Sequence, residues 1–249
     1  MLNSSSPVTL LKNVIVSNVW LLTDSEGRRF LIDSGVRTER LSIKVGLWFC
    51  GVRKKGDLTA LILTHRHSDH AGNAAWIREK YDCPVVCHEN DAEILSGQQK
   101  PPKLKRGVGP FYHEYICGLE DKKPSVCAVD ESITTGEWKY GFHIYPAYGH
   151  TEGSVLIYHE PTQTLFTGDA LLAGIPPLRQ FEWLGLAVPV YSLNVKQCHQ
   201  YMLDFLADPP PVSTVCSGHG PITQKNAAKK INNFYQRQIF KGKTELYSV

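Results

Sequence analysis

The stretch Thr64–Asn73, THRHSDHAGN, places three histidines and an aspartate within six positions. It follows an apolar run, LTALILT, that is typical of a strand buried on both faces. His65 and His67 are two residues apart at the end of this strand, so both imidazoles point the same way and can reach one ion. Asp69 and His70 follow at the expected turn into a helix. Imidazole nitrogen and carboxylate oxygen suit zinc, iron or manganese, so the stretch predicts a metal site.

Three later segments offer further ligands, each at the end of an apolar strand and beside glycine. PAYGHTEGS contains His150, LFTGDAL contains Asp169, and VCSGHGP contains His219. The glycines permit close approach of the backbone to a crowded site. Together with the first stretch, these segments supply five histidines and two aspartates, which is enough for two metals.

Strands and helices alternate along the chain, which indicates a layered α/β domain spanning residues 1–249. Asn13–Leu22 and Arg28–Gly35 flank a DSEG turn and predict a hairpin. Helices are predicted at GNAAWIREKY, at ENDAEILS, near SLNVKQCHQYMLDFL (Ser192–Leu206) and at ITQKNAAKKINNFYQRQI. Residues 97–118 and 171–191 lack periodicity and predict long variable loops, which in a domain of this size are often functional.

Composition narrows the class of protein. A hydrophobic content of 42% argues against disorder, and a net charge of +3 gives no sign of nucleic-acid binding. No apolar run is long enough to span a membrane, and the N-terminus lacks the pattern of a signal peptide. The seven cysteines are odd in number and scattered, which predicts reduced thiols in a cytoplasmic protein. Cys83 and Cys87, in CPVVC, are predicted to be core thiols rather than ligands.

The ordered motifs HRHSDH, GHT, TGDA and GHGP, with FLIDSG before them, resemble those of the metallo-β-lactamase superfamily. The resemblance runs from about Asn18 to about Pro221. It implies a four-layer αββα sandwich, in which two mixed β-sheets lie face to face between helices and a metal centre occupies one edge.

The resemblance also implies which residues bind metal. The implied ligands are His65, His67 and His150 for a first ion, Asp69, His70 and His219 for a second, and Asp169 as a bridge between them. Asp33 stands where the family has a residue that orients a ligand or loop, although it also suits a simple turn.

A dinuclear centre of this kind implies a hydrolase. Two zinc ions are expected, with iron or manganese as alternatives in one or both positions. A water held between the cations loses a proton near neutral pH, and the resulting hydroxide attacks the substrate. Asp69 is expected to be catalytic as well as a ligand, because it can orient the hydroxide and move a proton. No catalytic serine or cysteine is required.

Differences between this chain and individual branches of the superfamily constrain the class of substrate. A true β-lactamase is disfavoured, because the three-histidine class generally lacks the bridging aspartate. GHTEGS and LFTGDAL resemble glyoxalase II, but GHGPI replaces its usual motif and its long basic tail is largely missing. Homoserine-lactone hydrolases have a tyrosine where this chain has Leu171 and Leu172, and Tyr191 is a possible substitute. We therefore expect an ester, thioester or lactone of a small, partly apolar molecule.

The two long loops are the expected pocket walls, because loops at the metal edge determine the substrate in this fold. Residues 171–191 predict an apolar-aromatic wall, or alternatively a packing or dimer contact. Residues 97–118 predict a basic wall, or alternatively a solvated charged loop. The candidate substrate-binding residues are Arg106, Tyr112, Phe181, Trp183 and Tyr191.

Two other activities use related chemistry. A phosphodiesterase or ribonuclease would apply the same centre to phosphorus but should carry a long basic groove. A persulfide dioxygenase would use a single iron. The expected partner is a small-molecule substrate, with no nucleic acid and no membrane, and the protein is expected to be a monomer or homodimer.

Overall fold

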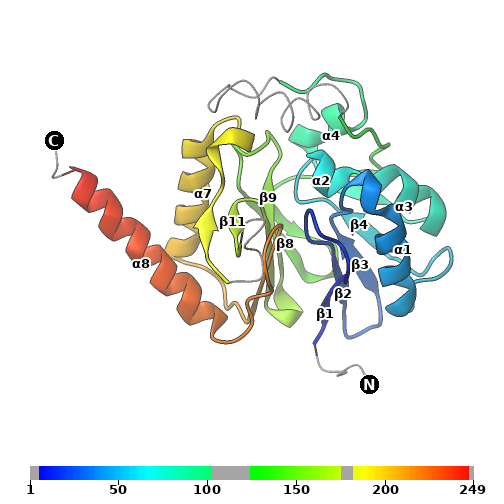
Figure 1. The fold of residues 1–249 in the computed structure, drawn as a ribbon, viewed down its shortest axis with the longest axis horizontal. Coiled ribbons are helices and arrows are strands. Elements are labelled where there is room, and N and C mark those ends of the chain that lie inside the picture. The colour runs from blue at the N-terminus through cyan, green and yellow to red at the C-terminus, as the bar shows by residue number, and fades with distance from the viewer. Residues whose placement is uncertain (1–5, 103–123, 175–181, 247–249) are drawn as a thin grey trace.

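Two β-sheets lie face to face in the middle of the molecule (Figure 1). The computed structural model describes residues 6–102, 124–174 and 182–246. In spatial order the first sheet contains β1 (Val8–Leu10), β2 (Trp20–Thr23), β3 (Arg29–Ile32), β4 (Ala60–Ile62), β5 (Val85–His88) and β6 (Glu131–Ile133). The second contains β13 (Thr214–Ser217), β10 (Thr164–Gly168), β9 (Val155–His159), β8 (Phe142–Pro146) and β7 (Gly136–Trp138). A separate two-stranded sheet pairs β11 (Leu171–Leu172) with β12 (Gly185–Leu186).

Both large sheets are mixed. The strands from β3 to β6 are parallel, as are β10 and β13, and the remaining neighbours are antiparallel. Alternate residues of each strand face opposite layers. Phe30 and Ile32 of β3 contact the core between the sheets, whereas Leu31 packs under the helices. In β10, Phe166 faces the other sheet and Leu165 faces outward. Burial on both faces explains why these strands read as continuous apolar runs.

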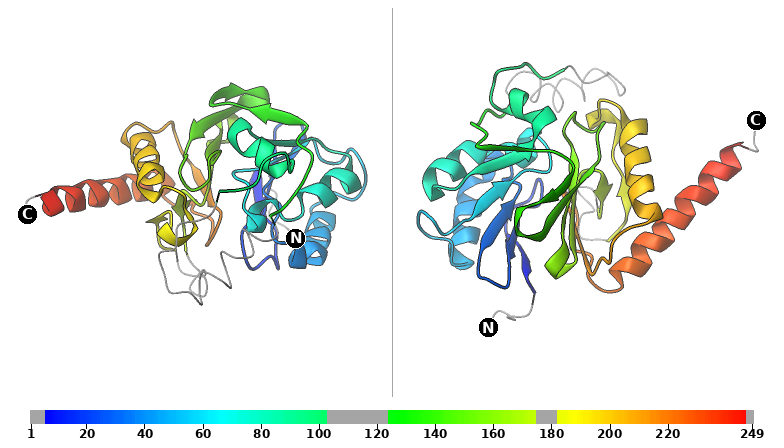
Figure 2. Two further views of the ribbon diagram at one scale, coloured as in Figure 1. Left: turned by 90° about the horizontal axis from the view of Figure 1, so that it is seen from above. Right: turned by 180° about the vertical axis from the view of Figure 1, so that it is seen from behind.

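Helices cover the outer face of each sheet, so the predicted αββα arrangement is confirmed (Figure 2). On the first sheet lie α1 (Arg40–Phe49), α2 (Ser68–Ala71), α3 (Ala74–Tyr81) and α4 (Glu89–Leu95), and on the second lie α7 (Val195–Ala207) and α8 (Ala227–Leu246). Short 3-10 helices are η1 (Arg37–Glu39), η3 (Lys139–Gly141), η4 (Glu160–Thr162) and η5 (Pro189–Tyr191). Within the described ranges, no helix has the length and apolarity to cross a membrane.

Some sequence expectations need correction. The predicted strand Asn13–Leu22 begins only at Trp20, and the residues before it form a loop in which Asn13 has a φ of 66°. This loop reaches the ligand-bearing edge, where the backbone N–H of Asn18 donates to the carbonyl of Gly218 at 2.7 Å. The predicted loop 171–191 contains the β11–β12 pair, and its residues 175–181 lie outside the described part. Cys83 and Cys87 are free and buried beneath the helices, as predicted.

Candidate metal centre

The seven candidate ligands meet at one edge of the sandwich, although they come from four separate stretches of the chain. His65 and His67 follow β4, Asp69 and His70 lie in α2, and the others follow strand ends in the same way. Those others are His150 after β8, Asp169 directly after β10, and His219 after β13. They form two clusters, His65–His67–His150 and Asp69–His70–Asp169–His219, and within each cluster the potential ligand atoms lie within 4.8 Å of one another.

The first cluster consists of three buried imidazoles. Nδ1 of His67 lies 3.0 Å from Nε2 of His150, and the ring of His65 packs edge-on against both at centroid distances of 4.9 and 4.7 Å. Three nitrogens that converge in this way can occupy three corners of a tetrahedral site.

The second cluster joins the first through Asp169. Its Oδ2 lies 3.6 Å from Nε2 of His150 in the first cluster and 3.4 Å from Nε2 of His219 in the second. Its Oδ1 lies 3.3 Å from Nε2 of His70. Asp69 completes the cluster, with Oδ2 at 3.3 Å from Nε2 of His219. One carboxylate therefore faces both clusters.

Hydrogen bonds fix which nitrogen of each ring points into the site. The hydroxyl of Ser192 donates to the carbonyl of Val188 at 2.9 Å, so it accepts from Nδ1 of His150 at 3.0 Å. Likewise the hydroxyl of Thr64 donates to Asp33 at 2.8 Å and accepts from Nδ1 of His65 at 3.0 Å. With Nδ1 protonated, Nε2 of His65 and of His150 presents a lone pair to the centre.

Several inward-facing atoms lack a hydrogen-bond partner among the described residues. Nε2 of His65, Nε2 of His70 and Oδ1 of Asp169 are all buried in this way. The last two lie 3.3 Å apart but without the alignment of a hydrogen bond. Buried polar groups are normally paired, so unpaired nitrogens and oxygens that converge on two points fit a pair of metal ions.

Close packing at the centre depends on two glycines. A Cβ on Gly218 would lie 2.6 Å from Cε1 of His70, and one on Gly168 would lie 2.7 Å from the hydroxyl of Thr64. Gly168 also has a φ of 47°. No other residue fits at these positions without displacing the neighbouring side chains, as the glycine-flanked motifs predicted.

The two clusters differ in how they hold protons. Burial lowers the pKa of His65 and His67 well below its usual range and that of His150 to about 4. Burial also lowers the pKa of His219, but the adjacent carboxylates of Asp169 and Asp69 outweigh it and raise the value to about 10. The pKa of His70 is raised well above its usual range because three carboxylates outweigh its burial. In the metal-free protein at pH 7, the first cluster is thus neutral and the second holds two imidazolium ions.

This difference predicts unequal release of protons when metal binds. The first equivalent of Zn²⁺ should release almost none, whereas the second should release about two more, since His70 and His219 must deprotonate to bind. Affinity for the second ion should therefore fall as the pH drops below the value of about 10 for His219, while affinity for the first should hold until the pH approaches the value of about 4 for His150. Titration calorimetry of the metal-free protein with Zn²⁺, in buffers of different ionisation enthalpy, measures the number of protons released by each equivalent. Equal release by both equivalents would contradict the assignment.

Asp33 supports ligands from both clusters. Its Oδ2 accepts from Nδ1 of His70 at 2.8 Å and from the hydroxyl of Thr64, and its Oδ1 accepts from the backbone N–H of Thr64 at 2.8 Å. The residue is buried and has a φ of 62°, a left-handed conformation that few residues other than glycine adopt. Aspartate adopts this conformation more readily than most side chains, so the φ value fits a turn, whereas the hydrogen bonds from His70 and Thr64 favour a ligand-orienting role.

Replacing Asp33 by asparagine should weaken metal binding by about 10- to 100-fold, because an amide nitrogen in place of Oδ2 can accept from neither His70 nor Thr64. Competition with a fluorescent chelator measures the affinity. Asp24 is the matched control, because its carboxylate bonds only within its own turn and to Arg28. Unchanged affinity in Asp33→Asn would show that Asp33 serves only the turn.

Asp91 was not predicted from the sequence, yet it joins the two histidine-bearing loops. Its Oδ2 accepts from the backbone N–H of Arg66 at 2.9 Å and from the hydroxyl of Thr151 at 2.8 Å. Its Oδ1 accepts from the backbone N–H of Gly153 at 2.9 Å. Burial raises its pKa to about 6, against the opposing effects of the guanidinium of Arg66 and these bonds, so it is mostly ionised at pH 7. The one local hint is that Asp91 lies three and four residues before Ile94 and Leu95 in ENDAEILS, which places a carboxylate on the apolar side of a short helix.

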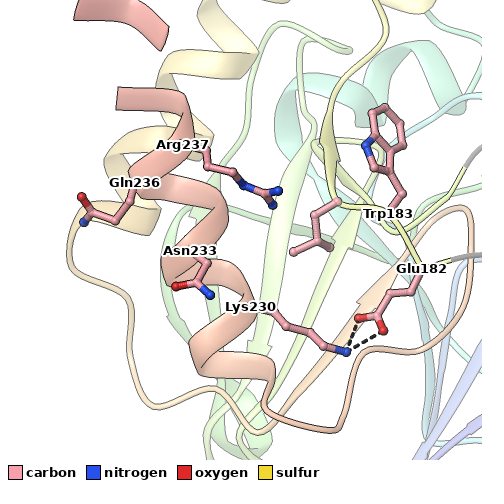
Figure 3. Close-up of a pocket in the computed structure, with 7 residues that line it drawn as sticks. Glu182, Trp183, Lys230, Asn233, Gln236 and Arg237 are labelled. Carbon is pink, nitrogen blue, oxygen red and sulfur yellow. Dashed lines mark hydrogen bonds and ion pairs between the residues drawn. The ribbon is translucent and has the colours of Figure 1, made fainter. Parts of the chain in front are cut away.

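The predicted substrate residues are only partly described. Arg106, Tyr112 and Phe181 lie outside the described residues. Tyr191 is half-buried at the end of η5, next to Ser192 and hence close to His150. Trp183 is exposed and lines a hollow of about 580 Å³ against α8 (Figure 3). None of the seven candidate ligands lines this hollow, so it is separate from the metal centre.

A four-layer sandwich with adjoining histidine–aspartate clusters at one edge defines a class of metal-dependent hydrolases. Residues 13–219 match the family model described as the metallo-β-lactamase superfamily, and the chain belongs to that superfamily.

Similar proteins are spread across the superfamily. A probable metallo-hydrolase of Bacillus subtilis, YqgX, is 29% identical over 74% of this chain and 79% of its own length. A second from the same organism, YybB, is 25% identical over 66% and 68%. A hydroxyacylglutathione hydrolase of Bdellovibrio bacteriovorus is 30% identical, but over only 51% and 40%. Among solved structures, TTHA1623 in a di-iron-bound form has a TM-score of 0.62 at 23% identity, covering 91% of this chain and 98% of its own.

Proposed function

We propose that the protein is a dinuclear zinc hydrolase that cleaves an ester, thioester or lactone of a small, partly apolar molecule. The observation that carries this is the carboxylate of Asp169, which faces both ligand clusters. A bridging carboxylate holds two cations close enough to act on one water and one substrate. Iron or manganese in one or both positions would suit the same donors.

When bound, the two cations would supply a nucleophile at neutral pH and polarise the oxygen of the scissile bond. The protein's own residues would hold and move protons around that reaction. In the metal-free protein the charged ring of His70 keeps the pKa of Asp69 well below its usual range despite burial, so this carboxylate is ionised before metal binds. The hydroxyl of Ser17 bonds to the backbone carbonyl of Asp69 and so positions it. Asp69 would orient the attacking water and pass its proton to the leaving group.

Relatives and local chemistry favour carbonyl substrates over phosphodiesters. Hydroxyacylglutathione hydrolases from three bacteria are 26–30% identical to this chain over about half of its length or more. Buried Leu171, Leu172 and Ala173 follow Asp169 closely, so the segment that leaves the centre here is apolar. Free thiols at all described cysteines support the cytoplasm as the compartment.

A substrate panel on enzyme of known metal content tests the proposal. Aryl esters, thioesters or lactones should exceed a bis-aryl phosphodiester in kcat/KM by about 100-fold or more, which corresponds to roughly 2.7 kcal/mol of transition-state discrimination. Chelation should abolish turnover and Zn²⁺ should restore it. Faster cleavage of the phosphodiester would assign the protein to the nucleases, and oxygen uptake with a persulfide would assign it to the dioxygenases.

A further inference from the structure

The outward side of α1 is apolar. Leu41, Val45 and Trp48 are exposed at helical spacing, and Phe49 extends the stripe, with 71% of Leu41, 51% of Trp48 and 68% of Phe49 accessible. The opposite side of the helix, with Ile43 and Leu47, is fully buried in the core. A surface helix normally carries polar residues on the side away from the core. The apolar residues on that side of α1 are therefore unusual for a helix face in water.

A neighbouring loop enlarges this apolar surface. Ile15 and Val16 are both exposed, and the carboxylate of Glu39, just before α1, accepts from their backbone N–H groups at 2.5 and 3.2 Å. We refer to the residues that form the combined surface as the α1 face: Ile15, Val16, Leu41, Val45, Trp48 and Phe49. Contiguous exposed apolar patches of this kind mark interaction sites.

Exposed cations are frequent in the stretch of chain that carries the α1 face. Between residues 36 and 57 six lysines and arginines are exposed, and Lys12 adds a seventh beside Ile15. These cations are Lys12, Arg37, Arg40, Lys44, Arg53, Lys54 and Lys55. The same span holds two acids, Glu39 and Asp57, and both carboxylates are engaged with backbone N–H groups. The guanidinium of Arg53 lies 4.5 Å above the ring of Trp48, so charge and apolar surface are in direct contact.

We propose that the α1 face docks the protein on an anionic lipid bilayer. A helix that lies in the interface with aromatic and aliphatic residues buried and lysines and arginines around them has this arrangement of side chains. Trp48 and Phe49 are residues that favour the level of the lipid headgroups. A two-fold contact between copies would instead bring two sets of seven cations together, so charge opposes self-association here.

Docking in this way would place the metal centre near the membrane. The α1 face begins beside Ser17, whose hydroxyl bonds to the backbone of Asp69. No membrane partner was expected because the sequence lacks a long apolar run, and no helix among the described residues could span a bilayer. Neither observation concerns a helix that lies in the interface. Membrane docking by the α1 face does not depend on the proposed function.

Vesicle flotation of the full chain tests the proposal. Binding to vesicles of phosphatidylcholine with about 30% phosphatidylserine should exceed binding to phosphatidylcholine alone by about tenfold and should weaken in high salt. The double variant Leu41→Glu/Trp48→Glu should lose about tenfold in binding to the anionic vesicles. The matched control is Val126→Glu, since Val126 is an exposed apolar residue outside this surface and its replacement should leave binding unchanged.

A charge variant keeps the test valid if the apolar variant folds poorly. Lys44→Glu/Lys54→Glu should also lose about tenfold, whereas Lys225→Glu/Lys229→Glu, on and beside α8, should not. Turnover of a soluble ester should be unchanged in all four variants. Equal binding by wild type and both α1 variants would overturn the proposal. So would binding to polyglutamate beads without binding to vesicles, which would assign the face to an acidic protein, or a dimer that the α1 variants dissociate.

Discussion

Asp169→Ala should lower turnover by about 10³-fold or more and reduce the metal content from about two ions to at most one. The reason is geometric, because this carboxylate is the group that faces both clusters, with oxygens 3.6 Å from Nε2 of His150 and 3.3 Å from Nε2 of His70. Its removal deprives each site of a ligand and leaves the imidazolium of His219 with only Asp69 as a counter-charge. Mass spectrometry of the metals and kcat on the same preparation measure both effects.

Asp208→Ala is the matched control, since Asp208 is an exposed acid at the end of α7, away from the ligand segments. It should keep full metal content and full turnover. Asp169→Asn separates charge from geometry, because it retains one oxygen ligand and should keep more metal than Asp169→Ala. Two ions and unimpaired turnover in Asp169→Ala would refute the dinuclear centre altogether.

Residues whose role depends on local pattern could be predicted from the sequence. Asp169 and His219 each end an apolar strand and adjoin a glycine, and such strand ends gather at one edge of a layered sandwich. The two-residue spacing of His65 and His67 is likewise a local property. The strand LTALILT was recognisable because parallel pairing buries it on both faces.

Residues whose role depends on distant contacts could not be predicted. Ser192 orients His150 across 42 positions, and Asp91 bonds to Thr151 across 60, so neither has a sequence neighbour that reveals its partner. In Asn13–Leu22 the residues before Trp20 were misassigned, because Val14 and Val19 pack into the core from a loop and the backbone N–H of Asn18 bonds to Gly218 at the metal edge. Helix α1 was not predicted from the sequence, because its apolar residues lie on both of its sides, and burial by the sheet decides which of them are core.

Asp91→Ala should destabilise the metal-free protein by about 3–5 kcal/mol, because it leaves a buried guanidinium without its closest buried counter-charge. The side chain of Arg66 is only 5% exposed, and Nε of its guanidinium lies 3.6 Å from Oδ1 of Asp91. The change also strips acceptors from two buried backbone N–H groups and from the hydroxyl of Thr151, each costing about 1–3 kcal/mol before relaxation. Urea unfolding of metal-free wild type and variant measures the difference without a contribution from bound metal.

Glu152→Ala provides the control, because Glu152 is the other carboxylate on Arg66 but its side chain is 32% exposed. Its loss should cost about 1 kcal/mol or less. If Asp91 also positions the ligands, Asp91→Ala should weaken metal binding by about 10- to 100-fold, since it bonds the loop of His65 and His67 to the loop of His150. Glu152→Ala should leave that affinity unchanged. A destabilised Asp91→Ala protein with wild-type affinity would restrict Asp91 to a structural role, and less than about 1 kcal/mol of destabilisation would contradict both roles.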